Sequence, residues 1–317
     1  MSSLNFPKVA IIVPAYNEEK YIGACLESLL NLKYPKDKVE ILVVDNGSAD
    51  RTVNIAASYG VKVLKKENTK VGGVRNFGVA SSSSEIVAFI DADCVAKEGW
   101  LSTAVNWLDN PKVGAVGGVY NLRVRPSWVE KAWVLGTRTT DTPTKTLPGG
   151  SFLMRRALFE ELGGFDSNIN AGEDSKLSYE IGSAGYGLWL LKDCSVVHLG
   201  YPNSIGGFAK RQFWHSSSYL KSNVGFKDKT FIASLLFTVC CAVFLLALVL
   251  GNASAMLLSL MVSLIICLTF TAKRVLFGNY DAINWKYIIP AVFLDYVYFI
   301  SRMSGLLFGA VKDPFKR

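Results

Sequence analysis

Short apolar runs alternate with helical patterns over the first 200 residues. Residues 9–13 form a short apolar run rich in Val and Ile, as expected for a strand that is buried on both faces. Residues 39–44 predict a second buried strand, and residues 61–64 and 86–90 predict a third and a fourth strand. Helical patterns lie between them, and Asn17 and Asp50 stand where N-caps of two of these helices belong. Strands that alternate with helices of about ten residues predict a parallel sheet with helices on its faces.

The chain changes character after about residue 230. Residues 231–250 and 253–272 contain no charged residue, and each is long enough to cross a hydrocarbon core of about 30 Å as a helix. Gly251 and Asn252 between them predict a tight hairpin. Basic residues flank both ends of this hairpin, which places both ends on the cytosolic side.

A third apolar stretch, at residues 287–311, carries Asp295 and Arg302. Charges inside a membrane are costly and face protein or water, so this stretch either spans the membrane or lies at its interface. Residues 206–229 carry five Lys or Arg residues against one Asp, with aromatic residues between them. Such a stretch beside an apolar span predicts an amphipathic juxtamembrane helix or a linker helix. We therefore expect a catalytic domain at 1–200, a juxtamembrane linker at 201–230 and a membrane domain at 231–317.

Composition and charge narrow the class of protein. The chain has 317 residues, 50% of them hydrophobic, and a net charge of +8, which excludes a disordered chain and a disulfide mini-protein. Its six cysteines form no C-x-x-C pair, so a reducing compartment fits. The chain start lacks the apolar segment of a signal peptide, and we expect a cytoplasmic catalytic domain on a multi-pass protein of the cell membrane. Because the basic residues gather beside the apolar stretches, no nucleic-acid partner is expected.

Polar residues follow several of the predicted strands, at the edge where α/β sheets bind ligands. Glu18 follows the first strand, Asp45 ends the second, and Asp91 and Asp93 follow the fourth. Two carboxylates two residues apart can hold Mg²⁺ or Mn²⁺, which binds phosphate oxygens in turn. The first turn lacks G-x-G-x-x-G, and the chain has no G-x-x-x-x-G-K, which argues against a dinucleotide-binding oxidoreductase and a P-loop enzyme.

Three further positions have both a structural and a functional interpretation. Glu173 and Asp174 precede a predicted helix, where they either complement the helix dipole or supply a general base. His198 follows an apolar strand and is either structural or a metal ligand. Arg75 is either a surface charge or a contact for phosphate or base.

Five motifs stand in order along the chain: VPAYNE at 13–18, VDNGSAD at 44–50, RNFG at 75–78, DAD at 91–93 and GED at 172–174. Together they resemble the family 2 glycosyltransferases, over about residues 8–200. The resemblance implies the GT-A fold, an α/β fold with a Rossmann-like mixed sheet flanked by helices, here followed by C-terminal transmembrane helices.

The resemblance also implies roles for individual residues. Asp93 is the direct metal ligand with Asp91 beside it, and some members add a histidine at the position of His198. Asp174 matches the catalytic base, with Glu173 as its neighbour. Contacts to the nucleotide-diphosphate sugar are implied for Pro14, Ala15, Tyr16, Asn17, Glu18, Asp45, Arg75, Asp91, Ala92, Gly149 and Gly150.

The implied activity is the inverting transfer of one sugar, with Mn²⁺ or Mg²⁺, to a membrane-lipid acceptor on the cytosolic face. Polyprenyl phosphate, a polyprenyl-diphosphate sugar and another lipid all fit as the lipid-linked acceptor. Processive polysaccharide synthases of this family carry Q-x-x-R-W, whereas residues 210–215 read KRQFWH, which favours single-sugar transfer. Arg211, Trp214 and His215 are candidates for contacts to the acceptor or the diphosphate. A processive synthase and a non-catalytic membrane-bound nucleotide-sugar-binding protein remain the alternatives.

Overall fold

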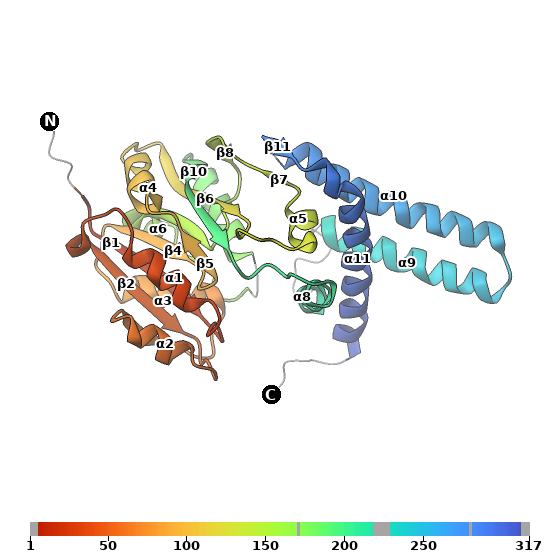
Figure 1. Cartoon of the computed structure of the whole chain (residues 1–317), viewed down its shortest axis with the longest axis horizontal. Coiled ribbons are helices and arrows are strands. Elements are labelled where there is room, and N and C mark those ends of the chain that lie inside the picture. Colours follow the sequence, from red (N-terminus) through yellow and green to blue (C-terminus); the bar gives the residue numbers. More distant parts are fainter. Residues whose placement is uncertain (1–5, 170–171, 218–228, 279–280, 312–317) are drawn as a thin grey trace. The chain divides into compact units, whose positions relative to one another are not determined.

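The computed structural model of the protein describes residues 6–169, 172–217, 229–278 and 281–311. The chain forms two compact units, and Figure 1 labels most of their elements. The first unit comprises Met1–Arg123 and Thr139–Gly200, and the second comprises Val124–Arg138 and Tyr201–Arg317. Each unit is described separately below.

One mixed sheet forms the centre of the first unit. Its order is β3-β2-β1-β4-β9-β6-β10-β5, with β8 paired to β10. The strands β3, β2, β1 and β4 run parallel, as the alternation of strands and helices predicts. β9 is antiparallel to both of its neighbours, so the sheet as a whole is mixed. The strand bounds are β1 (Val9–Ala15), β2 (Val39–Asp45), β3 (Lys62–Lys65), β4 (Ile86–Ile90), β5 (Cys94–Ala96), β6 (Val113–Asn121), β8 (Thr142–Thr144), β9 (Ser151–Arg155) and β10 (Gly187–His198).

Helices cover both faces of this sheet and create two apolar cores. Side chains alternate between the faces along β1, so Ile11 packs in one core and Ile12 in the other. The first core includes Leu26 of α1 and Trp100 of α4, and the second includes Val74 of α3. The helix bounds are α1 (Ile22–Leu30), α2 (Thr52–Ser58), α3 (Val71–Ala80), α4 (Trp100–Leu108), α6 (Arg156–Glu161) and α7 (Glu173–Ser183), with a 3-10 turn at Lys36–Lys38.

The prediction that Asn17 caps the first helix is wrong. The helix begins at Ile22, with Tyr21 as its N-cap. Asn17 instead has a positive φ of 56°, a left-handed conformation that Asn tolerates, and its side chain accepts a hydrogen bond from the amide of Ala49. Asp50 is not the N-cap of α2 either. This helix begins at Thr52, one residue later than expected, with Arg51 as its N-cap. The Asp50 carboxylate nevertheless accepts a hydrogen bond from the amide of Thr52.

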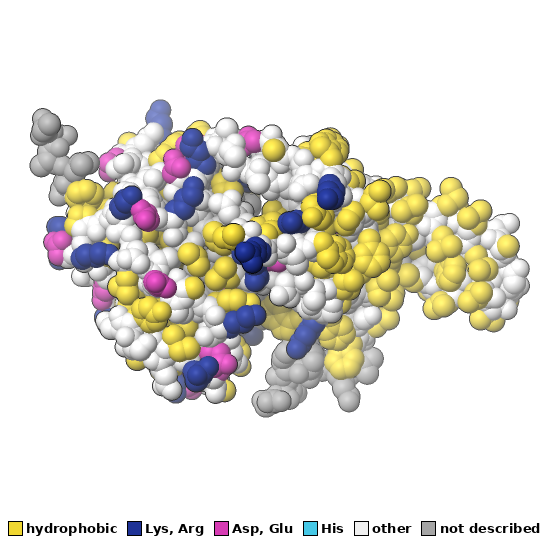
Figure 2. Space-filling view, viewed as in Figure 1, with side chains coloured by type: hydrophobic (Ala, Val, Ile, Leu, Met, Phe, Trp, Pro, Cys, Tyr) yellow, Lys and Arg dark blue, Asp and Glu magenta, His cyan; other side chains and the backbone are white. Residues whose placement is uncertain are grey.

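Four long helices dominate the second unit: α8 (Ile205–Ser217), α9 (Lys229–Val249), α10 (Ala253–Phe277) and α11 (Ile288–Val311). Among the described residues, three segments are long and apolar enough to cross a membrane: Thr230–Val249, Ala253–Leu276 and Trp285–Phe308. Gly251, with a φ of +67°, forms the predicted turn between α9 and α10, and Asn252 caps α10. Figure 2 shows hydrophobic side chains over the visible face of this hairpin, and many of its leucines are exposed.

The charges of α11 face neighbouring helices. Asp295 is fully buried, and its carboxylate pairs with Arg274 of α10 at 2.7 Å. The Nε atom of Arg302 donates to the side chain of Gln212 on α8 at 3.3 Å. α8 approaches α11 so closely that a Cβ at Gly305 would overlap the hydroxyl of Ser216. α8 lies within the predicted juxtamembrane linker, and residues 218–228 of that linker lie outside the described residues.

Residues 124–138 differ from the prediction, which placed them in the catalytic domain. They belong to the second unit. Ser127 and Glu130 form a capping box that starts α5 (Trp128–Val134), and Val129 of this helix is buried in a core with Leu294 and Phe299 of α11. β7 (Gly136–Thr137) then pairs with β11 (Ala282–Ile283), and a 3-10 turn at Trp285–Tyr287 precedes α11.

Candidate active site

A cavity of about 230 Å³ opens at the carboxyl ends of the parallel strands. β1 ends at Ala15, β2 ends at its register partner Asp45, and β4 ends just before Asp91. The cavity therefore lies at the edge of the sheet where the sequence places a ligand site. Its lining comprises Pro14, Ala15, Tyr16, Glu18, Asn46, Val71, Val74, Asp91, Ala92 and Asp93.

Asp45 and Asn17 support this edge rather than line the cavity. Asp45 is 1% exposed, and its carboxylate accepts hydrogen bonds from the amides of Gly47 and Ser48 at 3.0 and 3.1 Å. Asn17 joins the same loop, because its amide donates to the Ser48 hydroxyl at 2.9 Å. These bonds hold the loops after β1 and β2 together.

The pKa of Glu18 reflects the negative electrostatic potential of the cavity. Burial, followed by the charges of Asp93, Asp91 and Asp50, raises the pKa of Glu18 to about 7. Carboxylates that are crowded in this way repel one another, and a bound cation relieves the repulsion. The electrostatics of the cavity therefore favour a positively charged ligand.

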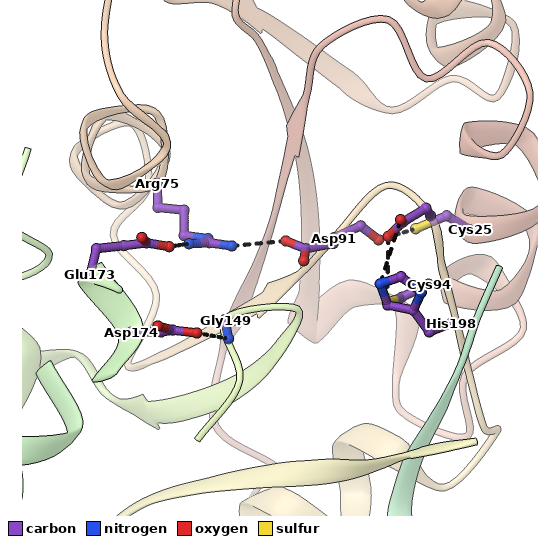
Figure 3. A network of polar contacts seen from close by, with 9 residues as sticks. Cys25, Arg75, Asp91, Cys94, Gly149, Glu173, Asp174 and His198 are labelled. Carbon is purple, nitrogen blue, oxygen red and sulfur yellow. Dashed lines mark hydrogen bonds and ion pairs between the residues drawn. The ribbon is translucent and has the colours of Figure 1, made fainter. Parts of the chain in front are cut away.

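Arg75 lies between the carboxylates of Glu173 and Asp91, as Figure 3 shows. Its Nη2 atom lies 2.8 Å from Asp91, and its Nη1 atom lies 2.5 Å from Glu173. The Arg75 and Glu173 side chains are only 4% and 7% exposed. The sequence interpretation of Arg75 as a surface charge is thus wrong. Its observed partners are carboxylates, so Arg75 orients Asp91 and Glu173.

The turn at Gly149 and Gly150 lies against this ion-pair network. A Cβ at Gly149 would come within 2.8 Å of the Arg75 guanidinium, and one at Gly150 within 2.5 Å of the Asp91 carboxylate. A side chain at either position would therefore have to displace a member of the ion-pair network, which glycine avoids. The amide of Gly149 also donates to Asp174 at 2.9 Å, which fixes this half-buried carboxylate near the start of α7, as Figure 3 shows.

The pairing of β10 with β5 places His198 next to Asp93, the last residue of the DAD motif. β10 pairs with β5 so that His198 lies opposite Cys94, and its Nε2 atom lies 3.6 Å from Oδ2 of Asp93. Donor atoms of Asp93, Cys94 and His198 all lie within 4.8 Å of one another. A carboxylate suits both Mn²⁺ and Mg²⁺, an imidazole suits a transition-metal ion such as Mn²⁺, and a thiol suits softer metals. Asp93 and His198 therefore fit a divalent cation.

The remaining predicted site residues lie in the second unit. Arg211, Trp214 and His215 are on α8, where Trp214 is 49% exposed. Arg211 and His215 line a cavity of that unit, which is separate from the one at the edge of the sheet.

Sequence reasoning missed some residues that build the cavity. Asn46 lies within one of the five motifs but received no role, and Val71 and Val74 also line the cavity. Cys25 of α1 contacts the backbone carbonyl of Asp91. An apolar or thiol side chain carries no local signal of a binding site, so only the packing shows these contacts.

Comparison with known proteins identifies the domain. Residues 10–163 match Glycosyl transferase family 2. The chain is 29% identical over 218 residues to glycosyltransferase AglE of Haloferax volcanii, covering 65% of this chain and 71% of that protein. It is 26% identical over 233 residues to a beta-monoglucosyldiacylglycerol synthase of Trichormus variabilis, covering 68% of this chain but only 50% of that protein.

A solved structure supports the fold. The mannosyltransferase PcManGT from Pyrobaculum calidifontis, in complex with GDP-Man and Mn²⁺, aligns with a TM-score of 0.58 at 22% identity, over 95% of this chain and 87% of that one. These matches are consistent with the mixed sheet and with the acidic motif after β4. Residues 10–163 therefore form a family 2 glycosyltransferase domain of the GT-A fold, and the chain is a glycosyltransferase.

Proposed function

We propose that the protein is an inverting, metal-dependent glycosyltransferase that moves one sugar from a nucleotide-diphosphate sugar to a membrane-lipid acceptor. The observation that carries the proposal is the acidic cavity after β1 and β4, bordered by Asp91 and Asp93, with His198 beside Asp93. A diphosphate is itself anionic, so an acidic cavity accepts it only together with a cation. The cavity therefore suits a cation-bound nucleotide diphosphate.

Each of these residues has a task in the proposed reaction. The loops after β1 and β2 hold the nucleoside, and Asp93 and His198 hold Mn²⁺ or Mg²⁺. When bound there, the cation neutralises charge on the diphosphate leaving group. Arg75 keeps Asp91 and Glu173 in place through its two ion pairs.

Asp174 is the proposed general base. Its carboxylate is half-buried and is oriented by the amide of Gly149. It removes the proton from the attacking acceptor oxygen while that oxygen forms a bond to the anomeric carbon. Attack opposite the leaving diphosphate inverts the configuration at that carbon. Glu173 is bound to Arg75, so its proposed role is to position its neighbour.

The lipid acceptor is inferred from the second unit and from the relatives. In the part of the chain that the structure describes, three helices are long and apolar enough to cross a membrane, and one relative is named for the synthesis of a diacylglycerol glycolipid. An enzyme that glycosylates a lipid headgroup gains from being held at the membrane, because the acceptor does not leave it. The basic residues that flank the hairpin favour a cytoplasmic catalytic unit.

The proposal is tested by incubating the full chain with membrane lipid extract and a panel of radiolabelled nucleotide sugars, with Mn²⁺ or with EDTA. We expect one donor to label the lipid fraction with Mn²⁺, and EDTA to abolish this labelling. Release of only water-soluble sugar would contradict a lipid acceptor. Equal labelling in EDTA would contradict metal dependence.

A further inference from the structure

The second unit contains a cavity of about 470 Å³ that has no role in the sugar-transfer chemistry proposed above. This volume lies within the range of small-molecule sites. Its walls come from α5, α8, α10 and α11. Two of these helices, α10 and α11, are among the three that are long and apolar enough to cross a membrane.

Positive charge gathers in this cavity. Arg211, Lys273, Arg274 and Arg302 line it, and none of the lining residues that the structure describes is acidic. Asp295 pairs with Arg274 from behind and offsets one of these charges. Four basic side chains that converge from three helices are unusual in a unit built around apolar helices, where charges mark functional sites.

The pKa of His215 reflects the positive electrostatic potential of this cavity. It lies on α8 one turn after Arg211, so the two side chains share a face of the helix. Burial, followed by the charges of Arg211 and Arg302, lowers the pKa of His215 to about 4. Its imidazole is therefore neutral at pH 7 and can accept or donate a hydrogen bond without adding to the charge.

Aromatic rings form the rest of the wall and hold the guanidinium groups in place. Trp133 and Tyr298 stack with their centroids 5.9 Å apart. Arg274 lies over Trp133 at 5.0 Å, and Arg302 lies over Tyr298 at 4.5 Å. Phe270 also contacts Tyr298, at 5.2 Å between centroids. The cavity thus combines oriented cations with a rigid apolar surface.

We propose that this cavity binds the terminal phosphate or diphosphate of a membrane lipid. Guanidinium and ammonium groups are the side chains that recognise phosphate, and the aromatic wall suits the first part of a hydrocarbon chain. A terminal phosphate carries nearly two negative charges at pH 7, whereas a phosphodiester carries one, so several converging cations favour the terminal group. The inference concerns headgroup binding and holds whether or not the bound lipid accepts the sugar.

The test is a titration of the full chain in detergent, followed by native mass spectrometry, with three lipid probes and one soluble probe. The lipids are a polyisoprenyl monophosphate, the polyisoprenol with the same chain, and phosphatidylglycerol. Inorganic pyrophosphate is the soluble probe. We expect one saturable site for the monophosphate, at least about 10-fold tighter than for the other three, because charge-assisted hydrogen bonds and a hydrocarbon contact act together.

Variants locate the site. Arg211→Gln and Lys273→Gln alter exposed side chains, so both proteins should fold, and each should bind the monophosphate about 10-fold more weakly. Lys210→Gln is the matched control, because Lys210 is an exposed neighbour on α8 that is not among the lining residues. Its affinity should equal that of the wild type.

Three results would overturn the inference. Equal binding of polyisoprenol would show that the phosphate is not recognised, and equal binding of pyrophosphate would show that the lipid is not. Affinities unchanged in both cavity variants would place the lipid elsewhere. Because no sugar donor is present, the outcome does not depend on the proposed transferase activity.

Discussion

Nε2 of His198 lies 3.6 Å from Oδ2 of Asp93, although the two residues are far apart in the sequence. The antiparallel pairing of β5 with β10 causes this proximity, because it places His198 opposite Cys94, the residue after Asp93. A turn between two strands thus presents its carboxylate toward an imidazole on a third. This arrangement underlies the proposed metal site.

Replacing Asp93 should weaken metal-dependent donor binding. In Asp93→Ala, we expect the affinity for a nucleoside diphosphate in the presence of Mn²⁺ to fall by at least about 10-fold, the loss seen when even an outer partner of a metal ligand is removed. Isothermal titration calorimetry measures it. Asp37→Ala, at an exposed carboxylate of the 3-10 turn, should bind as the wild type does. Normal Mn²⁺-dependent affinity in Asp93→Ala would remove Asp93 from the metal site.

Replacing Asp174 should separate chemistry from donor binding. The Asp174→Asn side chain keeps an oxygen that can accept the hydrogen bond from the Gly149 amide, so the turn at Gly149 and Gly150 should be retained. Without a base, we expect kcat for transfer to fall by about 100-fold or more, with donor affinity unchanged. Single-turnover transfer and calorimetry on the same preparation test both parts. Full activity in this variant would place the base at another residue.

Breaking the buried ion pairs of Arg75 should destabilise the protein. Arg75→Gln leaves Glu173 buried without its cation, a change that typically costs about 3–5 kcal/mol, so the melting temperature of the first unit should fall. The double variant Arg75→Gln/Glu173→Gln removes both charges of this ion pair and should recover part of the lost melting temperature. A melting temperature unaffected by Arg75→Gln would indicate that the ion pairs are not maintained in solution.

The low pKa of His215 predicts a pH-dependent stability of the second unit. The folded pKa is about 4, below the ordinary value of 6.5, so the unfolded chain binds the proton more readily. The contribution of neutral His215 to the free energy of unfolding is therefore complete above pH 6.5 and is lost as the pH falls from 6.5 toward 4. We expect the melting temperature in detergent to fall over that range, and to fall less in His215→Gln. Identical pH profiles for the two proteins would contradict the half-buried, neutral state of His215.

Local patterns were sufficient to predict much of the fold. The parallel strands, the helices between them and the apolar hairpin follow from hydrophobic periodicity and from Gly251 and Asn252. Residues 124–138 could not be assigned this way. Val129 and its neighbours are apolar enough for either unit, and only long-range packing with α11 decides between them.

The candidate site was predictable in its residues but less so in their contacts. The motifs identified Glu18, Asp91 and Asp93, which the structure places in one cavity. They did not indicate that Arg75 would be buried between Asp91 and Glu173, since a partner far away in sequence leaves no local signal. The position of His198 beside Asp93 likewise depends on strand register.

The central claim is that Asp93 and His198 hold the cation of a nucleotide-diphosphate sugar. It is tested most directly by anomalous diffraction at the manganese edge, from crystals of the full chain soaked with Mn²⁺ and a nucleoside diphosphate. The account predicts one strong manganese peak in contact with both side chains and with the diphosphate oxygens. A nucleotide bound elsewhere, or bound in this cavity with no manganese at Asp93, would contradict it.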